Sequence, residues 1–183
     1  MNTTRPANSF LQRLLGAAAL DTAIYEEVEA DPKAGVQAGV VVVLSSVAAG
    51  IGARGFNETS AGNIAFFSIL ALMAWACWAL LTFEIGTRLL PESETSADVG
   101  QLMRTIGFAA TPGLIRIFGF IPGVTIPAFI VSSIWMLLAM VVAVRQALDY
   151  KHTGRAIAVC VLGWVLALTV ALVLGIFLGP TVS

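Results

Sequence analysis

Residues 105–123 read TIGFAATPGLIRIFGFIPG, and this stretch decides the fold. It is apolar enough for a bilayer, yet Pro112 removes a backbone donor and clashes with the preceding helical turn. Gly107 and Gly113 loosen the helix further, and Arg116 lies near the middle. In lipid, a broken helix that carries an arginine is tolerated only where protein or water covers it. We therefore predict a helix break at Gly107, Pro112 and Gly113, in a segment that the rest of the chain surrounds.

The composition of the whole chain is that of a membrane protein. Of its 183 residues, 58% are hydrophobic and 11% are charged, whereas a soluble domain carries about 25% charged residues. The mean hydropathy of +0.90 points the same way. The net charge is −1, without a basic stripe that would neutralise phosphates, which argues against nucleic acid as a partner. We predict an all-α membrane protein whose partner is the lipid bilayer.

Residues 1–33 are more polar than the remainder and form a predicted cytoplasmic region. After a polar tail at 1–8, apolar residues recur every three or four positions over 9–29, which predicts an amphipathic helix capped by Ser9. Asp31-Pro32 ends it, because the residue before a proline avoids the helical conformation. We expect this helix either to lie on the membrane surface or to dock on the protein's own bundle.

Residues 34–183 form a predicted membrane domain with five apolar segments of about the 20 residues that a span needs. These segments are residues 34–53, 64–83, 104–121, 124–144 and 156–178. In the first of them, Gly35 and Gly39 form a small-xxx-small pair of the kind that lets helices approach closely. The fold class that follows is a five-span helical bundle with an N-terminal amphipathic interfacial helix.

Positive charges predict the orientation of this bundle. With the N-terminus in the cytoplasm, the inner segments hold Arg5, Arg13, Lys33, Arg88, Arg104, Arg145, Lys151 and Arg155. The outer segments hold only Arg54 and Arg116. Because Lys and Arg concentrate on the cytoplasmic side, we predict a multi-pass integral membrane protein with its N-terminus in the cytoplasm and its C-terminus outside.

Charged residues gather where the predicted spans end on the inner side. Glu84 and Arg88 lie four positions apart in the order that favours pairing on a helix, and Arg145 and Asp149 form a second candidate ion pair. With Arg104, these residues fall near one interface. We expect them to form a layer of ion pairs that closes the inner end of the bundle.

The sequence offers little for catalysis. Its one histidine, His152, lies in a polar loop without a partner at metal-ligand spacing, and no Ser–His–Asp set or phosphate-binding loop is present. Cys77 and Cys160 both lie inside apolar runs, as small buried hydrophobes do. We predict a protein that is not an enzyme and has no catalytic residues, metal site or cofactor.

Several short motifs together resemble the Ypt-interacting-protein (YIP) membrane family. They are an amphipathic segment that ends in Asp31-Pro32, five spans, and a GF-xxx-P element made by Gly107, Phe108 and Pro112. The fourth-to-fifth connection at 144–159, VRQALDYKHTGRAIAV, is similar to the family's short polar turn. The resemblance extends over about residues 5–178. It implies the five-span fold and a role in membrane organisation or trafficking.

The eukaryotic members of the family are partners of Rab-type GTPases and carry a DLxGP element near the first spans. The corresponding region of this chain reads FNETSAGNIAFF, and no long cytoplasmic tail precedes the first predicted span. Both departures argue against GTPase binding. The Ala, Val and Gly richness resembles the short prokaryotic members, which implies a location in a prokaryotic inner (cytoplasmic) membrane.

Two functions follow from these patterns. The first is a scaffold or accessory subunit that binds a membrane-protein partner, or a second copy of itself, through helix–helix contacts. The second is a small transporter or channel-like module built around the broken third span, because discontinuous helices often supply the site of a transporter. The candidate polar site of that module consists of Glu84, Arg88, Arg104, Thr111 and Arg116.

Overall fold

The computed structural model describes residues 8–55, 61–91 and 98–178, and all regular elements in these ranges are helical. The fold class is therefore all-α, as predicted. The elements are α1 (Phe10–Ala18), α2 (Thr22–Ala30), α3 (Ala34–Gly52), η1 (Ala53–Gly55), α4 (Ala61–Glu84), η2 (Ile85–Leu89), α5 (Val99–Ala109), η3 (Thr111–Phe120), α6 (Thr125–Ala147) and α7 (Thr153–Leu178).

The predicted N-terminal helix at 9–29 is two helices, so a single continuous helix is wrong. Ser9 caps α1 as expected, and its hydroxyl accepts from the Gln12 amide at 3.3 Å. The chain then turns at Leu20, whose φ of 63° is left-handed. Asp21 restarts the helix, because its side chain accepts from the Ala23 amide at 3.0 Å. The two short helices form what we call the N-terminal hairpin, residues 10–30.

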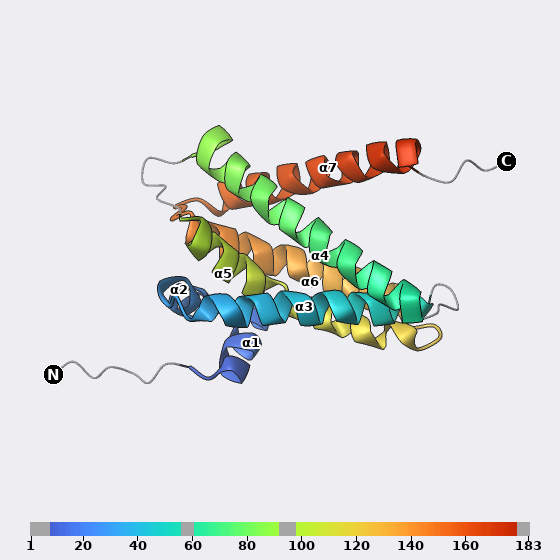
Figure 1. Cartoon of the computed structure of the whole chain (residues 1–183). Coiled ribbons are helices and arrows are strands. Elements are labelled where there is room, and N and C mark those ends of the chain that lie inside the picture. The colour runs from blue at the N-terminus through green and yellow to red at the C-terminus, as the bar shows by residue number, and fades with distance from the viewer. Residues whose placement is uncertain (1–7, 56–60, 92–97, 179–183) are drawn as a thin grey trace.

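Three described helices are long and apolar enough to cross a membrane: Ala34–Gly55, Ser68–Leu89 and Thr125–Ala147. A shorter apolar stretch, Thr153–Leu166, lies in α7. In Figure 1, α3, α5 and α6 run side by side, α4 crosses them diagonally, and α7 extends along the edge of the bundle. Each of the five predicted spans corresponds to helical structure, and three meet the requirements of a span by length and composition.

The helix is broken within residues 105–123, as the sequence predicts. α5 ends at Ala109, Ala110 caps it, and a 3₁₀ helix begins at Thr111 with Pro112 in its first turn. This position suits proline, because the first amide groups of a helix have no acceptor within the helix. The backbone around the break is buried, since α3 and α6 both pack against η3. The predicted shielding therefore holds at the break itself, whereas Ile117, Phe118 and Phe120 in the second half of the segment are exposed.

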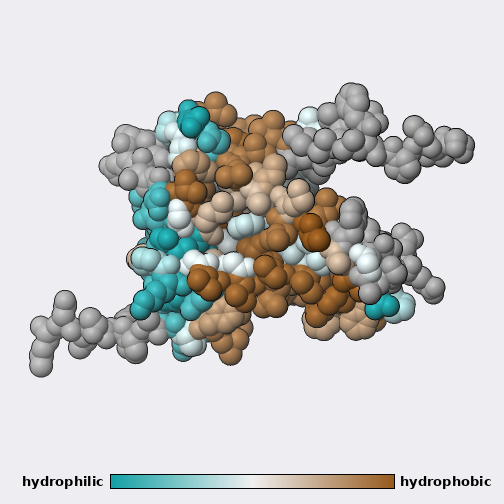
Figure 2. Space-filling view, viewed as in Figure 1, coloured by the Kyte–Doolittle hydropathy of each residue, from teal (hydrophilic) through white to brown (hydrophobic). Residues whose placement is uncertain are grey.

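Polar residues concentrate at one end of the bundle. Figure 2 shows hydrophilic residues at the end that carries α2 and the start of α5, and a broad hydrophobic surface along the helices beyond it. α6 ends and α7 begins at this same end, where the hydroxyl of Tyr150 lies 2.8 Å from the carbonyl oxygens of both Gly86 and Leu90. We call this region the polar end.

Candidate functional site

Arg13 is the most completely enclosed charge of the polar end. Its side chain is 3% exposed, and its guanidinium contacts three side chains from two other helices. Nε donates to Glu27 at 2.9 Å, Nη1 to Gln37 at 2.9 Å, and Nη2 to Asp31 at 2.8 Å. Because the planar guanidinium presents its donors in a fixed fork, one side chain joins α1 to α2 and α3.

The charges around Arg13 stabilise one another in their ionised forms. Hydrogen bonds from Arg13 and from the Lys33 amide hold the pKa of Asp31 below its ordinary value. At Glu27, partial burial acts in the opposite direction, but hydrogen bonds from Asn8 and Arg13 together lower the pKa. Burial of Arg13 likewise disfavours its charge, and the bonds to both carboxylates more than compensate, so its pKa is raised. The cluster is therefore an ion network with a net negative charge.

Arg104 fixes the N-terminal hairpin to the bundle. Its Nε donates to the carbonyl oxygens of Val28 at 3.1 Å and Glu29 at 3.2 Å, where α2 ends and its last carbonyls lack partners within the helix. A cation at this position also interacts favourably with the helix dipole. A second anchor joins the end of α1 to α6, because the indole N–H of Trp135 donates to the Ala18 carbonyl at 2.7 Å.

The outer face of α1 is apolar. Leu11 and Leu15, one turn apart, are each 63% exposed, while Arg13 and Ala17 point inward. Of the two placements that the sequence leaves open for the N-terminal region, docking on the protein's own bundle is the one observed. The hairpin nevertheless presents leucines outward from α1, a surface suited to lipid.

Glu84 and Arg88 form the predicted pair, with 3.0 Å between Oε2 and Nε. The pair lies where α4 passes into the π-helical turn η2, and its side chains are 48% and 73% exposed. Exposed pairs of this kind contribute about 0–1 kcal/mol. Arg104 does not join them, because its guanidinium is engaged by the end of α2.

The predicted ion pair between Arg145 and Asp149 is not formed, and the expected layer of ion pairs is therefore wrong. Salt bridges join Arg13 to Glu27 and Asp31 and join Arg88 to Glu84, but none joins Arg145 to Asp149. The reason is local: α6 ends at Ala147, and Asp149 adopts a left-handed φ of 51°, so the helical spacing of four residues no longer applies. Arg145 instead donates to the Tyr150 carbonyl at 3.4 Å.

The residues of the predicted helix break pack closely on α3. The hydroxyl of Thr111 donates to the Phe108 carbonyl at 2.6 Å and closes the last turn of α5. Gly107 lies against Ala38, and a Cβ at Gly113 would overlap the hydroxyl of Ser45. Because the helix is broken here, both the end of α5 and the start of η3 can approach α3 closely.

Arg116 belongs to η3, and its side chain packs against α6. It makes no salt bridge with the described carboxylates. Nε donates to the Ser132 hydroxyl at 2.9 Å and Nη2 to the Ser133 hydroxyl at 3.1 Å. The guanidinium carbon also lies 5.4 Å from the centre of the Phe129 ring, within cation–π range. The guanidinium of Arg116 is therefore surrounded by two hydroxyls and an aromatic ring.

A small cavity of about 30 Å³ adjoins Arg116 at mid-depth in the bundle. Its lining residues are Val42, Ser45, Ser46, Ala71, Trp75, Ala110, Arg116 and Met136. Trp75 has a buried indole N–H without a hydrogen-bond partner among the described residues. Two further unpartnered groups, the indole N–H of Trp78 and the hydroxyl of Thr82, follow on the same face of α4. The polar groups that line this cavity are hydroxyls, an indole N–H and a guanidinium.

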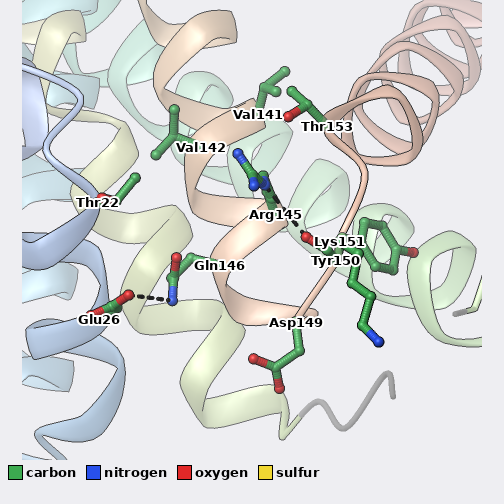
Figure 3. A pocket seen from close by; sticks show the side chains of 10 residues that line it. All are labelled: Thr22, Glu26, Val141, Val142, Arg145, Gln146, Asp149, Tyr150, Lys151 and Thr153. Atoms are coloured by element: carbon green, nitrogen blue, oxygen red, sulfur yellow. Dashed lines mark hydrogen bonds between the residues drawn. The ribbon is translucent and has the colours of Figure 1, made fainter. Parts of the chain in front are cut away.

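A larger cavity of about 440 Å³ opens at the polar end, between α2 and the junction of α6 and α7 (Figure 3). It is lined by Thr22, Glu26, Val141, Val142, Arg145, Gln146, Asp149, Tyr150, Lys151 and Thr153. The sequence pattern pointed to Arg145 and Asp149 as a pair and missed the cavity between α2 and the junction of α6 and α7. Sequence reasoning also missed that Arg13 is buried and paired. The acids Glu27 and Asp31, which follow it within 20 residues, could have indicated this pairing.

Within residues 8–55, 61–91 and 98–178, no group of three or more His, Cys, Asp or Glu side chains is arranged to hold a metal ion. In comparisons with known proteins, no family model, curated protein or solved structure matches this chain. The resemblance to the YIP family therefore stays a prediction from the sequence.

Proposed function

We propose that this chain is a five-span integral membrane protein that acts as a scaffold or accessory subunit, through helix–helix contacts rather than catalysis. The spans in this proposal are α3, α4, the α5–η3 segment, α6 and α7, with the N-terminal hairpin in the cytoplasm. The hydrophobic surface of Figure 2 and the separate polar end support this placement. A role in membrane organisation, as the YIP resemblance implies, is consistent with the outward leucines of α1.

The observation that carries the scaffold proposal is the exposure of α4. In the candidate span Ser68–Leu89, 22% of the most apolar window is buried, compared with 28% in Thr125–Ala147 and 50% in Ala34–Gly55. The outward side of α4 includes two small residues, Ala74 and Cys77, between larger apolar ones such as Met73. Small residues allow a neighbouring helix to approach closely, which is the main source of association between helices in lipid.

Ala74→Trp tests this surface. We expect the wild-type protein, purified in mild detergent, to carry a second membrane protein or a second copy in stoichiometric amount, identified by mass spectrometry. The indole of Ala74→Trp holds a neighbouring helix away and is expected to reduce this co-purification about tenfold, since a tightly packed contact is lost. Leu138→Trp is the matched control, because Leu138 lies on the outward side of α6. A partner retained by Ala74→Trp, or lost equally from Leu138→Trp, contradicts the proposal, as does a wild-type protein that purifies alone.

A second candidate function is the passage of a small anion through the bundle. The mid-depth cavity supports it, because its polar groups are donors that suit an anion and it lies beside the break between α5 and η3. A cavity of about 30 Å³ has room for one water-sized guest, which fits an occluded state. Transporters place sites at mid-depth beside broken helices in this way.

Chloride flux in proteoliposomes tests the second function. We expect the wild-type protein to release chloride down a gradient, and Arg116→Gln to reduce the rate about tenfold, because the site loses its cation. Arg88→Gln is the control, since Arg88 is exposed at the polar end. Flux no faster than from empty liposomes, or unchanged in Arg116→Gln, removes this function.

A further inference from the structure

The cavity of about 440 Å³ at the polar end has a balanced set of charges. Two acids, Glu26 and Asp149, and two bases, Arg145 and Lys151, line it. A ligand with charge of a single sign would meet like charges as well as opposite ones. A ligand that carries both signs, separated by a few atoms, matches this lining better than an anion or a cation does.

Arg145 and Asp149 are held apart, which leaves both charges available to a ligand. Four residues apart in sequence, they would pair on a continuous helix, but the chain leaves the helical path after Ala147. The guanidinium of Arg145 makes one long hydrogen bond, from Nε to the Tyr150 carbonyl at 3.4 Å. Figure 3 shows Arg145 extending toward Thr153 at the start of α7, whereas Asp149 points away from them.

The acidic side of the cavity lies against α2. Glu26 accepts a hydrogen bond from the side chain of Gln146 at 3.3 Å, which holds its carboxylate at the cavity wall. Partial burial raises the pKa of the neighbouring Glu29, and the nearby charge of Asp149 adds to this effect. Glu29 and Asp149 are thus close enough to interact, and Arg104 acts on the pKa of Glu29 in the opposite direction. The carboxylates of α2 and Asp149 together favour a cation on this side of the cavity.

The inner wall of the cavity is apolar and continues into the outward surface of α6. Val141 and Val142 line the cavity one turn before Arg145. Ile134 and Leu138 precede them on the same side of the helix and are 57% and 51% exposed. In the membrane placement proposed above, this stripe contacts acyl chains. The cavity therefore opens onto the lipid, and a bound ligand can extend from the cavity into the bilayer.

We propose that this cavity binds the head group of a zwitterionic phospholipid that carries a primary ammonium. Its phosphate lies on Arg145 and the hydroxyl of Thr153, its ammonium donates to Glu26 and Asp149, and its acyl chains follow Val141 and Val142. The N-terminal end of α7, where Thr153 is the first residue, adds a favourable field for the phosphate. This assignment rests on the membrane placement but not on the scaffold or anion functions.

Lipid binding to the full-length protein in mild detergent tests the proposal. The probes are phosphatidylethanolamine, phosphatidylcholine, phosphatidylglycerol and free phosphoethanolamine, with bound lipid counted by native mass spectrometry. We expect phosphatidylethanolamine to bind tightest. The quaternary ammonium of phosphatidylcholine donates no hydrogen bond, phosphatidylglycerol has no cation, and free phosphoethanolamine lacks the acyl chains that the apolar wall contacts.

Two variants remove one charge each and keep the local backbone. Asp149→Asn retains a residue that tolerates the left-handed conformation, and Arg145→Gln retains a good helix former near the end of α6. Each is expected to weaken phosphatidylethanolamine binding about tenfold, since each removes a charge-assisted hydrogen bond. Arg88→Gln, outside the cavity, is expected to bind as the wild type does.

Each alternative outcome overturns the proposal in a distinct way. Phosphatidylglycerol that binds as tightly as phosphatidylethanolamine, with loss in Arg145→Gln alone, indicates a plain anion site. Free phosphoethanolamine that binds as tightly as the lipid shows that the acyl chains have no part. Equal binding by the wild type, Arg145→Gln and Asp149→Asn shows that the lipid lies elsewhere. None of these results changes the co-purification expected for α4, so the two proposals fail separately.

Discussion

Arg13→Gln is expected to lower the free energy of unfolding by about 3 kcal/mol, because removal of one partner from a buried ion pair leaves the others without a counter-charge. Arg13 is nearly inaccessible, and glutamine replaces neither its charge nor its three-way fork. Glu27 and Asp31 are 25% and 28% exposed, which lets water reach them and keeps the loss at the lower end of the buried range. Thermal unfolding of the full-length protein in detergent measures the effect.

Two variants make the measurement specific. Arg13→Lys keeps the charge but cannot reach three partners at once, so we expect an intermediate loss. Arg88→Gln removes an exposed pair and is expected to cost about 0–1 kcal/mol. A loss in Arg13→Gln no larger than that in Arg88→Gln would show that the network around Arg13 stabilises the fold no more than an exposed ion pair does.

Acid provides a second readout of the same network. The pKa values of Glu27 and Asp31 are lowered on folding from ordinary values of 4.5 and 3.8. Their contribution to stability is therefore fully present above these values and is lost as the pH falls through the lowered ones. The difference between wild type and Arg13→Gln should shrink below about pH 4. Glu29, whose pKa is raised, favours the folded state as the pH falls, but it is present in both proteins and cancels in the difference.

Gly52→Ala is expected to destabilise the bundle, although it adds only one methyl group. The backbones of α3 and η3 meet at this point: a Cβ at Gly52 would overlap the carbonyl oxygen of Arg116, and one at Gly119 would lie 2.9 Å from the Gly52 carbonyl oxygen. Backbone atoms cannot swing aside as a flexible side chain does, so η3 must shift. Overpacking of this kind costs about 1–3 kcal/mol. Thermal unfolding in detergent again provides the measurement.

Gly39→Ala is the matched control on the same helix. No atom lies within 4 Å of a Cβ built at Gly39, and alanine favours a helix over glycine by about 1 kcal/mol. We therefore expect unchanged or slightly increased stability. Equal losses at the two positions would mean that the close contact between α3 and η3 is not a determinant of stability. The small-xxx-small pair read from Gly35 and Gly39 is accordingly not where α3 makes its closest approach.

Local rules account for the features that the sequence could predict. Pro112 permits no continuous helix, Ser9 and Asp31 mark the ends of the N-terminal helices, and Glu84 reaches Arg88 because both lie on one helical path. Each of these effects acts within a few residues. Apolar run length likewise indicates which segments are long enough to span.

The features that were missed depend on tertiary contacts or on a turn without a glycine. Leu20 adopts a left-handed conformation that its residue type does not signal, so the break between α1 and α2 was not apparent. Arg104 could meet Glu84 or the end of α2, and only the packing of the hairpin decides between them. For Asp149, the left-handed turn separates it from Arg145 and creates the cavity at the polar end.

The two anchors of the N-terminal hairpin lie far from it in sequence, which sets an order of assembly. Arg13 meets Glu27 and Gln37 as soon as the first 40 or so residues have left the ribosome, since a loop of that length closes quickly. The residues that hold the finished hairpin come much later, because Trp135 lies 117 positions after Ala18. The N-terminal hairpin can therefore reach its final packing only after α6 has been made. A chain that stops before α6 keeps the anchor from Arg104 to the end of α2 but lacks the anchor from Trp135 to the end of α1.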